Sequence, residues 1–285
     1  MKPHAVITCC DAKYGDFLVR HWLRSLRDHV NLDHIDVVVL DYGLSPEQAE
    51  QLRAQSVILH PSKKDGNLTN IRYRDLVAFL KDKAYDQVLS IDSGDIIFQA
   101  DISPMFELDK ESFRAVREYF TGGMHIALLG ADDVRPEFRE EIKLFLWNRS
   151  AVNGGVLFGP ARRFVEFYDE LTRLCHSFVH YATDQLLLSY FLDKTGFVPL
   201  DDRYNFALMM TRTRYRVRRG VFLDPDGKPL PVVHNSGQKD WIRTVRNFGY
   251  GPDRNQVKWL LPAYLRFSQA LLRRWNQLWR PTRTP

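Results

Sequence analysis

Two carboxylates flank a serine and a glycine in Asp92-Ser-Gly-Asp95, directly after the apolar run Val88–Ile91. Carboxylate oxygens at such a turn are ligands that Mg²⁺ and Mn²⁺ accept, and a turn leaves room for water and substrate phosphates. The same composition is also ordinary in turns that bind nothing. The stretch therefore has two interpretations, a divalent-cation site or a plain turn, and the rest of the chain must decide between them.

A further candidate ligand, His234, ends an apolar run and is followed by Gly237, Lys239 and Trp241. A lone histidine is usually a structural residue. Here, however, a histidine at a strand end with a lysine close behind suits a metal ligand beside a phosphate contact, because lysine places a compact positive charge on phosphate oxygens. His234 is therefore a candidate third ligand.

Elements that could position these groups alternate along the first hundred residues. Apolar runs predict strands, and amphipathic spacing or capping residues predict helices, in the order strand 5–10, helix 17–30, strand 35–40, a helix capped by Ser45, strand 56–60, helix 71–81 and strand 88–91. This is the pattern of an α/β fold with a mainly parallel sheet and helices on both faces. Ligands bind such sheets beyond the carboxyl ends of the strands, where Asp11, Asp41 and Asp92 lie.

The second half is less regular. We expect helices at 135–148, at 160–180 and from Thr183 onward, and strands at 151–158, 197–200 and 232–234. In residues 211–219, four alternating arginines (Arg212, Arg214, Arg216, Arg218) would share one face of a strand. That face is either a solvated sheet edge or a positive wall beside an anionic acceptor.

Composition excludes several classes. The 285 residues are 45% hydrophobic, enough for a substantial core, and the three cysteines form no disulfide framework. The first residues are too polar for a signal peptide, and we expect no membrane-spanning helix. The net charge is +5, but residues 256–285 carry six basic residues and no acid. The rest of the chain is therefore near neutral, which argues against a nucleic-acid partner.

Four motifs in fixed order carry a resemblance to a known family: the turn at 92–95, Asn153-Gly-Gly, Thr183-Asp-Gln185 and His234-x-x-Gly237-x-Lys239. Together they resemble glycosyltransferase family 8, and the bacterial lipopolysaccharide enzymes are closest in character. These are retaining transferases of the GT-A fold, with a Rossmann-like, mainly parallel central sheet. The resemblance spans residues 5–241.

The resemblance implies a nucleotide-sugar donor, usually a UDP-sugar, and a bound Mn²⁺ or Mg²⁺. Asp95 matches the second aspartate of the family's Asp-x-Asp motif and His234 its distal histidine. The first aspartate of the motif falls on Ser93, whereas the carboxylate here is one residue earlier, at Asp92. Either Asp92 reaches the metal from a shifted turn or it acts through water.

Other roles also follow from the resemblance. Asp11 would contact the nucleotide base and Tyr14 would stack on it, Arg74 would face the donor, and Gly237 and Lys239 would hold the diphosphate; Thr8 and Ser93 complete the donor-binding set. Asn153, Asp184 and Gln185 would line the sugar pocket and support catalysis. Asp184 could instead simply cap its helix.

The basic tail reads as a separate element. We expect a catalytic domain over residues 1–250 and an amphipathic helix within 251–285, where Arg266, Arg273 and Arg280 share a face opposite Leu- and Trp-rich positions. Such a helix suits an anionic membrane surface, contacted through residues 258–280, or else packs on the protein or a second subunit. We expect a cytoplasmic protein attached to the inner face of the membrane.

The leading hypothesis is a metal-dependent retaining transferase that moves a hexose to a saccharide or lipid-linked saccharide acceptor. Two alternatives stay open. One is a nucleotidyltransferase on a similar α/β fold, and the other is a non-catalytic nucleotide-sugar-binding protein. The identities of the sugar, the acceptor and the linkage do not follow from the sequence.

Overall fold

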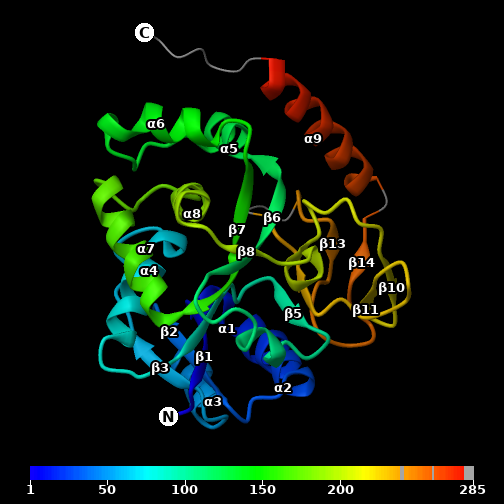
Figure 1. The fold of residues 1–285 in the computed structure, drawn as a ribbon. Coiled ribbons are helices and arrows are strands. Elements are labelled where there is room, and N and C mark those ends of the chain that lie inside the picture. The colour runs from blue at the N-terminus through cyan, green and yellow to red at the C-terminus, as the bar shows by residue number, and fades with distance from the viewer. Residues whose placement is uncertain (238–240, 259, 279–285) are drawn as a thin grey trace.

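The computed structural model describes residues 1–237, 241–258 and 260–278. A seven-stranded sheet of order β3-β2-β1-β4-β7-β6-β8 forms its centre (Figure 1). Its strands are β1 (His4–Cys10), β2 (Ile35–Asp41), β3 (Ile58–Pro61), β4 (Gln87–Ile91), β6 (Arg114–Thr121), β7 (Ser150–Pro160) and β8 (Val198–Pro199). Strands β3, β2, β1 and β4 run parallel, whereas β7 is antiparallel to β4 and β6. The mainly parallel α/β fold is thus confirmed, and Ile91 at the end of β4 pairs with Val156, beside the Asn-Gly-Gly motif.

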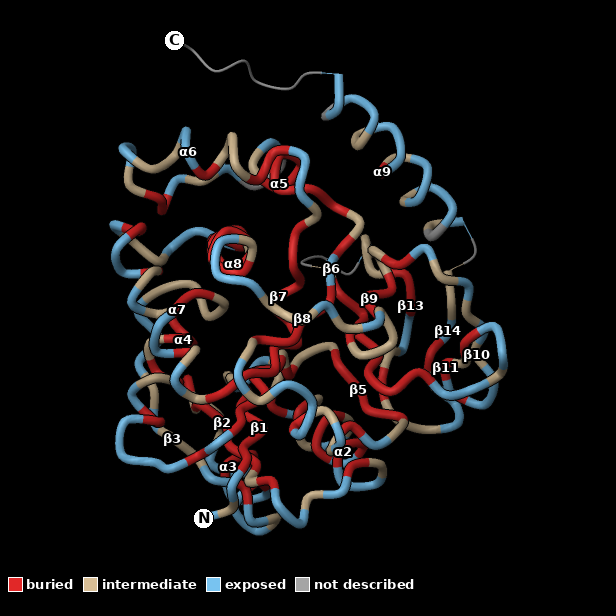
Figure 2. Tube along the Cα trace, viewed as in Figure 1, coloured by how far each residue is buried: buried red, intermediate tan, exposed pale blue. Residues whose placement is uncertain are grey.

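Helices cover both faces of the sheet because successive side chains of each strand point to opposite sides. Ala5 and Ile7 of β1 join one core, and Val6 joins the other. Figure 2 shows the buried strands running between helices that mix buried and exposed residues. The first core lies under α4 (Leu68–Leu80), α6 (Pro136–Leu146), α7 (Ala161–Leu174) and α8 (Thr183–Thr195). The second lies under α1 (Ala12–Phe17), the π-helix η1 (Leu18–Leu23), α2 (Arg24–His29) and α3 (Pro46–Arg53).

A smaller sheet places His234 beside the central sheet. Its order is β5-β12-β9, formed by β5 (Ile96–Phe98), β12 (Val232–His234) and β9 (Phe206–Ala207). Because β12 runs antiparallel to β5, His234 pairs with Ile96 and arrives beside Asp95. Around this sheet lie the 3₁₀ turns η2 (Ser103–Phe106) and η3 (Asp202–Asn205), and the hairpins β10 (Arg216–Arg218) with β11 (Val221–Leu223) and β13 (Val245–Arg246) with β14 (Gln256–Val257).

Several expected elements differ from those found. The helix expected over 17–30 begins earlier, because the Asp11 side chain accepts a hydrogen bond from the Lys13 amide and caps α1. The helix expected over 160–180 ends at Leu174. The segment beyond it is held differently, because the buried Asp133 carboxylate accepts hydrogen bonds from the amides of Val179 and His180. Strand β6 and helix α5 (Gly122–Leu129) were not anticipated at all.

The arginine-rich segment 211–219 forms a strand only at Arg216–Arg218. Arg212 lies outside it, with its guanidinium carbon 3.7 Å from the centroid of the Tyr119 ring. A single face of four arginines on one strand is therefore not formed. The partner of Arg212 is an aromatic side chain of β6 rather than solvent alone.

The tail forms α9 (Leu261–Leu278), which packs on α5 and β6 (Figure 1). The buried Gln269 faces the protein and donates to the carbonyl of Met209 at 2.8 Å. The outward side carries Tyr264, Phe267, Leu271, Trp275 and Leu278, each at least 47% exposed. Trp279 and Arg280, also assigned to this helix from the sequence, lie outside the described residues. None of the described helices is long and apolar enough to span a bilayer.

Candidate active site

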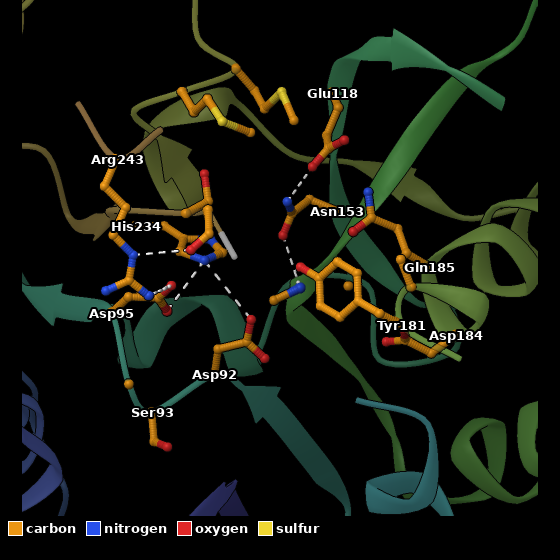
Figure 3. Close-up of a pocket in the computed structure, with 18 of the residues that line it drawn as sticks. Asp92, Ser93, Asp95, Glu118, Asn153, Tyr181, Asp184, Gln185, His234 and Arg243 are labelled. Carbon is orange, nitrogen blue, oxygen red and sulfur yellow. Dashed lines mark hydrogen bonds and ion pairs between the residues drawn. The ribbon is translucent and has the colours of Figure 1, made fainter. Parts of the chain in front are cut away.

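A cavity of about 450 Å³ opens beyond the carboxyl ends of β1 and β4, the place expected for a ligand in such a sheet. Its wall combines residues from both halves of the chain (Figure 3). Charged and polar groups occupy one part, and Phe120, Tyr181, Met209, Met210 and Ile242 form an apolar part. This mixture suits a ligand that is partly ionic and partly a sugar or other ring with apolar faces.

The acidic turn is fixed in place by its backbone and by Ser93. The Asp92 amide donates to Gly155 O at 3.0 Å, and the indole of Trp22 donates to Asp92 O at 3.0 Å. The Ser93 hydroxyl donates to Cys9 O at 2.7 Å. The Ser93 hydroxyl is therefore bonded to the end of β1, while the carboxylates of Asp92 and Asp95 extend toward His234 (Figure 3).

Asp92, Asp95 and His234 form a cluster in which one ligand atom from each lies within 4.8 Å of the others. The Nε2 atom of His234 is 3.4 Å from Asp95 Oδ1 and 3.8 Å from Asp92 Oδ2. Burial disfavours a charged imidazole, but the two nearby carboxylates outweigh it and raise the pKa of His234 above its ordinary value. Two carboxylates and one imidazole converging on a point are a donor set that fits Mn²⁺ or Mg²⁺.

A chain of hydrogen bonds orients the imidazole. Asn153 donates through Nδ2 to the buried carboxylate of Glu118, so its Oδ1 is left to accept from Asn205 Nδ2 at 2.7 Å. The Oδ1 atom of Asn205 in turn lies 3.0 Å from His234 Nδ1. Because this oxygen can only accept, Nδ1 must donate, so the neutral imidazole that binds a metal would present the lone pair of Nε2 to the carboxylate cluster.

Two arginines hold the outer sides of the acidic pair. Arg72 Nη1 donates to Asp92 Oδ1, leaving Oδ2 directed at His234. Arg243 Nη2 lies 3.3 Å from Asp95 Oδ2, leaving Oδ1 directed at the same imidazole. Each carboxylate thus has one oxygen bound by a cationic side chain and one turned toward the candidate metal position.

Arg72 also forms a deeply buried ion pair with Asp184. The distance from Nη2 to Asp184 Oδ2 is 3.0 Å, and the two side chains are 5% and 4% exposed. Burial raises the pKa of the Asp184 carboxyl, and the Arg72 guanidinium opposes that shift. Asp184 lies in the first turn of α8, two residues after the N-cap residue Ala182, so it does not itself cap the helix.

The Asn-Gly-Gly motif is required for steric reasons. A Cβ atom on Gly155 would lie 2.7 Å from His234 Cε1, 2.8 Å from Asp92 Oδ2 and 2.9 Å from Asn153 Oδ1. A Cβ on Gly154 would meet nothing closer than 3.3 Å. The absence of a side chain at Gly155 therefore makes the space in which the cluster converges.

The residues predicted to bind a donor are only partly brought together. Tyr14, Ser93 and Gly237 line the cavity. Asp11 instead pairs with Lys64 at 2.7 Å, and Thr8 is buried within β1. Arg74 points away to Asp65 and Asp75, so Arg72 occupies the place in the wall that was predicted for Arg74. Lys239 lies outside the described residues. The predicted sugar-pocket residues Asn153, Asp184 and Gln185 all line the cavity.

The polar residues of the wall that were not foreseen include Arg72, Glu118, His125 and Arg243. The Oε2 atom of Glu118 lies 3.3 Å from His125 Nε2, and Gln185 Nε2 lies 3.4 Å from the same nitrogen. Cys9 also lines the cavity, but burial raises the pKa of its thiol to about 12, so it is a neutral group rather than a nucleophile.

Three solved glycosyltransferases share this fold. The glycosyltransferase GlyE of Streptococcus pneumoniae is 19% identical, with a TM-score of 0.53 over all of this chain and 66% of its own. The bifunctional glycosyltransferase WbbM is 16% identical, with a TM-score of 0.53 over 84% of this chain and 46% of its own. The galactosyltransferase LgtC, solved with donor and acceptor sugar analogues, is 16% identical, with a TM-score of 0.52 over 94% of this chain and 95% of its own.

This chain therefore spans slightly less than two thirds of GlyE and less than half of WbbM. No protein-family model matches the sequence. No curated protein matches it either. The likenesses confirm the fold expected from the motifs, the GT-A type of α/β fold.

Proposed function

We propose that this chain is a metal-dependent, retaining glycosyltransferase of the family 8 type, which transfers a hexose from a nucleotide sugar, most simply a UDP-sugar. The observation that carries the proposal is the convergence of Asp92, Asp95 and His234 in the wall of the large cavity, at the carboxyl end of β4. The shared fold with three solved glycosyltransferases supports it. The acceptor is a saccharide or a lipid-linked saccharide.

The cluster would hold Mn²⁺ or Mg²⁺, which supplies positive charge for the diphosphate that leaves when the sugar–phosphate bond breaks. The protein contributes by holding both carboxylates in position. Arg72 and Arg243 do so from the outer sides, and Arg243 is itself anchored by donating to Gly237 O at 3.0 Å. Gly237 lines the cavity at a φ of 137°, a conformation that favours glycine and lets the backbone approach a diphosphate closely.

The sugar would lie between the cluster and the start of α8. Asp184 is committed to Arg72, so we assign its remaining oxygen capacity to the sugar hydroxyls rather than to nucleophilic attack. Gln185 and Asn153 border the same space, and Tyr181 offers a ring face for the sugar (Figure 3). An amide is a poor nucleophile, which favours attack by the acceptor hydroxyl on the face that the leaving group departs from.

The proposal is tested by incubating the protein with UDP-glucose, UDP-galactose and Mn²⁺ and following UDP release and anomeric protons by NMR. Release of UDP with an α-configured product is expected, and a β-configured product would contradict the retaining mechanism. A parallel incubation with UTP and a sugar 1-phosphate tests the nucleotidyltransferase alternative. Diphosphate release there, without turnover of either UDP-sugar, would identify a nucleotidyltransferase instead. UDP-sugar binding with no turnover would identify a non-catalytic binding protein.

Membrane attachment is the second part of the proposal, and it divides the chain into a catalytic part, 1–250, and an attachment part, 251–285. The outward side of α9 carries Tyr264, Phe267 and Leu271, and Arg274 on the same helix is also exposed. Aromatic and aliphatic side chains with arginines along their border suit the interface of an anionic membrane. The protein would then work on the cytoplasmic face of the cell membrane, on lipid-linked acceptors such as those of lipopolysaccharide.

Vesicle sedimentation tests the attachment. The protein should sediment with vesicles of phosphatidylglycerol and phosphatidylcholine, and the double variant Phe267→Ser/Leu271→Ser should stay in solution. Val165→Ser, which changes an exposed apolar residue of α7, is the control and should sediment normally. Equal sedimentation of all three proteins, or of none, would contradict the assignment to α9.

A further inference from the structure

A second, smaller cavity of about 240 Å³ adjoins the proposed transfer site. The two cavities share three wall residues, Glu118, Asn153 and Met210. A group in the smaller cavity would therefore lie next to whatever occupies the acceptor side of the larger one. Its remaining wall comes from β6, from the segment 202–212 and from α9.

Two guanidinium groups meet on one aromatic ring in this wall. The guanidinium carbon of Arg212 lies 3.7 Å from the centroid of Tyr119, and that of Arg273 lies 4.7 Å from it. Arg212 also donates to the Tyr119 hydroxyl. The ring holds both cations in place, since guanidinium groups stack on aromatic faces. Arg273 belongs to α9, so the tail helix contributes directly to this cavity.

The charges around the two arginines are not balanced locally. Among the described residues, no carboxylate forms an ion pair with Arg212 or Arg273. Arg117 in the same wall is already paired with Asp193. The acids present are committed elsewhere, since Glu118 binds Asn153 and His125, and Asp202 Oδ2 accepts from Thr213 at 2.7 Å and Thr211 at 3.4 Å. Both guanidinium groups lie against the Tyr119 ring without a paired carboxylate, and a bound anion would balance their charge.

We propose that Arg212, Arg273 and Tyr119 form an anion subsite for the acceptor, which therefore carries a phosphate or a carboxylate close to the hydroxyl that is glycosylated. The proposal deepens the proposed function, and the identification of the bound anion as part of the acceptor rests on that function. The binding site itself does not, because it is built from different side chains than the metal cluster. Arginine suits either anion, since its planar fork matches phosphate and carboxylate oxygens.

The test measures the binding of three probe sugars at constant ionic strength by NMR titration: glucose, glucose 6-phosphate and glucuronate. At least one anionic probe should bind about tenfold or more tightly than glucose, the effect of one added charge-assisted hydrogen bond. Which probe gains more distinguishes a phosphorylated from a carboxylated acceptor. The gain should disappear in Arg212→Gln and Arg273→Gln and be partly kept in Arg273→Lys.

Arg274→Gln is the matched control, because it removes the same charge from an exposed position next in the sequence of the same helix. It should leave the gain unchanged, as should Asp95→Asn, which disables the proposed metal cluster but not this cavity. Loss of the gain in Asp95→Asn alone would place the anion at the metal cluster and overturn the proposal. So would an equal loss in Arg274→Gln, or no gain in the unaltered protein. Circular dichroism of each variant confirms that it is folded.

Discussion

Glu118 and His234 stand at opposite ends of a single hydrogen-bond chain that passes through Asn153 and Asn205. An ionised carboxylate can only accept, so it sets the direction of both amides and, through them, the tautomer of the imidazole. Glu118, in β6, does not touch the candidate metal position, but it thereby determines which nitrogen of the neutral His234 imidazole carries the proton. Groups of this kind behind a ligand commonly change metal affinity by about 10- to 100-fold.

Asn205→Ala tests this chain. Without the amide, His234 loses the partner that keeps the proton on Nδ1, so Mn²⁺ affinity should fall by about 10- to 100-fold. Electron paramagnetic resonance of free Mn²⁺ measures the affinity. Asn235→Ala is the control, because the side chain of this neighbouring buried asparagine donates to Val245 O and, among the described residues, to no member of the chain. Equal affinities for the two variants would show that the chain does not orient the histidine.

The ion pair of Arg72 and Asp184 should be a major determinant of stability. Arg72→Leu leaves the Asp184 carboxylate buried without its cation, and we expect a loss of about 3–5 kcal/mol in the free energy of unfolding. Urea denaturation measures it. Arg74→Leu, two residues away on α4, removes a more exposed arginine from its ion pairs and should cost less. Similar costs for both variants would contradict the role assigned to burial.

The two glycines of the motif should differ sharply on substitution. Gly155→Ala places a methyl group against His234 and Asp92, so it should weaken Mn²⁺ binding at least about tenfold and cost about 1–3 kcal/mol of stability through overpacking. Gly154→Ala meets the Arg72 guanidinium at 3.3 Å and Asp184 at 3.5 Å, so it should disturb Mn²⁺ binding less than Gly155→Ala does. Calorimetric titration with Mn²⁺ measures the affinity of each variant. A larger effect at Gly154 would refute the steric account.

The loop before α8 should respond to pH through Asp133 and His180, whose Oδ1 and Nδ1 atoms are 2.9 Å apart. The hydrogen bond to Asp133 raises the pKa of His180, so its stabilising effect is complete below the ordinary histidine pKa of about 6.5 and is lost as pH rises through the folded value. Burial opposes ionisation of Asp133, but hydrogen bonds from Ser177 and His180 outweigh it and lower its pKa. Its contribution is present above about pH 4 and is lost as pH falls through the folded value.

The loop should therefore be most ordered between about pH 4 and 6.5. In Asp133→Asn, NMR titration should show the pKa of His180 falling toward its ordinary value, with the other histidine signals as internal references. The same pKa in both proteins would mean that the carboxylate does not hold the histidine. The loop leads directly into Asp184 and Gln185, so its order bears on the sugar side of the site.

The strand–helix alternation and the cluster of Asp92, Asp95 and His234 could be predicted because short apolar runs and polar strand ends are local signals. Whether the Asp92 carboxylate faces the candidate metal position, although the motif places its first aspartate at Ser93, could not be predicted. It depends on the Ser93 hydroxyl bonding to Cys9 O, a contact between residues 84 positions apart. The same limit applies to Arg243, which reaches Asp95 from a loop with no distinctive composition.

Arg72 illustrates a signal that was present in the sequence. On a helix, residues 72, 76 and 79 share a face, and Leu76 and Phe79 are apolar, so Arg72 lies on the buried side. Arg74 falls on the other side and meets the exposed Asp65. By contrast, the inward orientation of Arg273 on α9 has no sequence signal. It results from the docking of Gln269 on the Met209 carbonyl and from Tyr119, which lies on an unanticipated strand.

The most direct test of the account is UDP release from the better of the two UDP-sugars by protein stripped of metal, measured with and without added Mn²⁺. We predict no turnover until Mn²⁺ is added, a loss of at least about 100-fold in Asp92→Asn and in Asp95→Asn, as when an electrostatic stabiliser is removed, and a smaller loss in Ser93→Ala. Turnover that persists in chelator and in both aspartate variants would contradict the central claim that these carboxylates hold a cation at the leaving diphosphate.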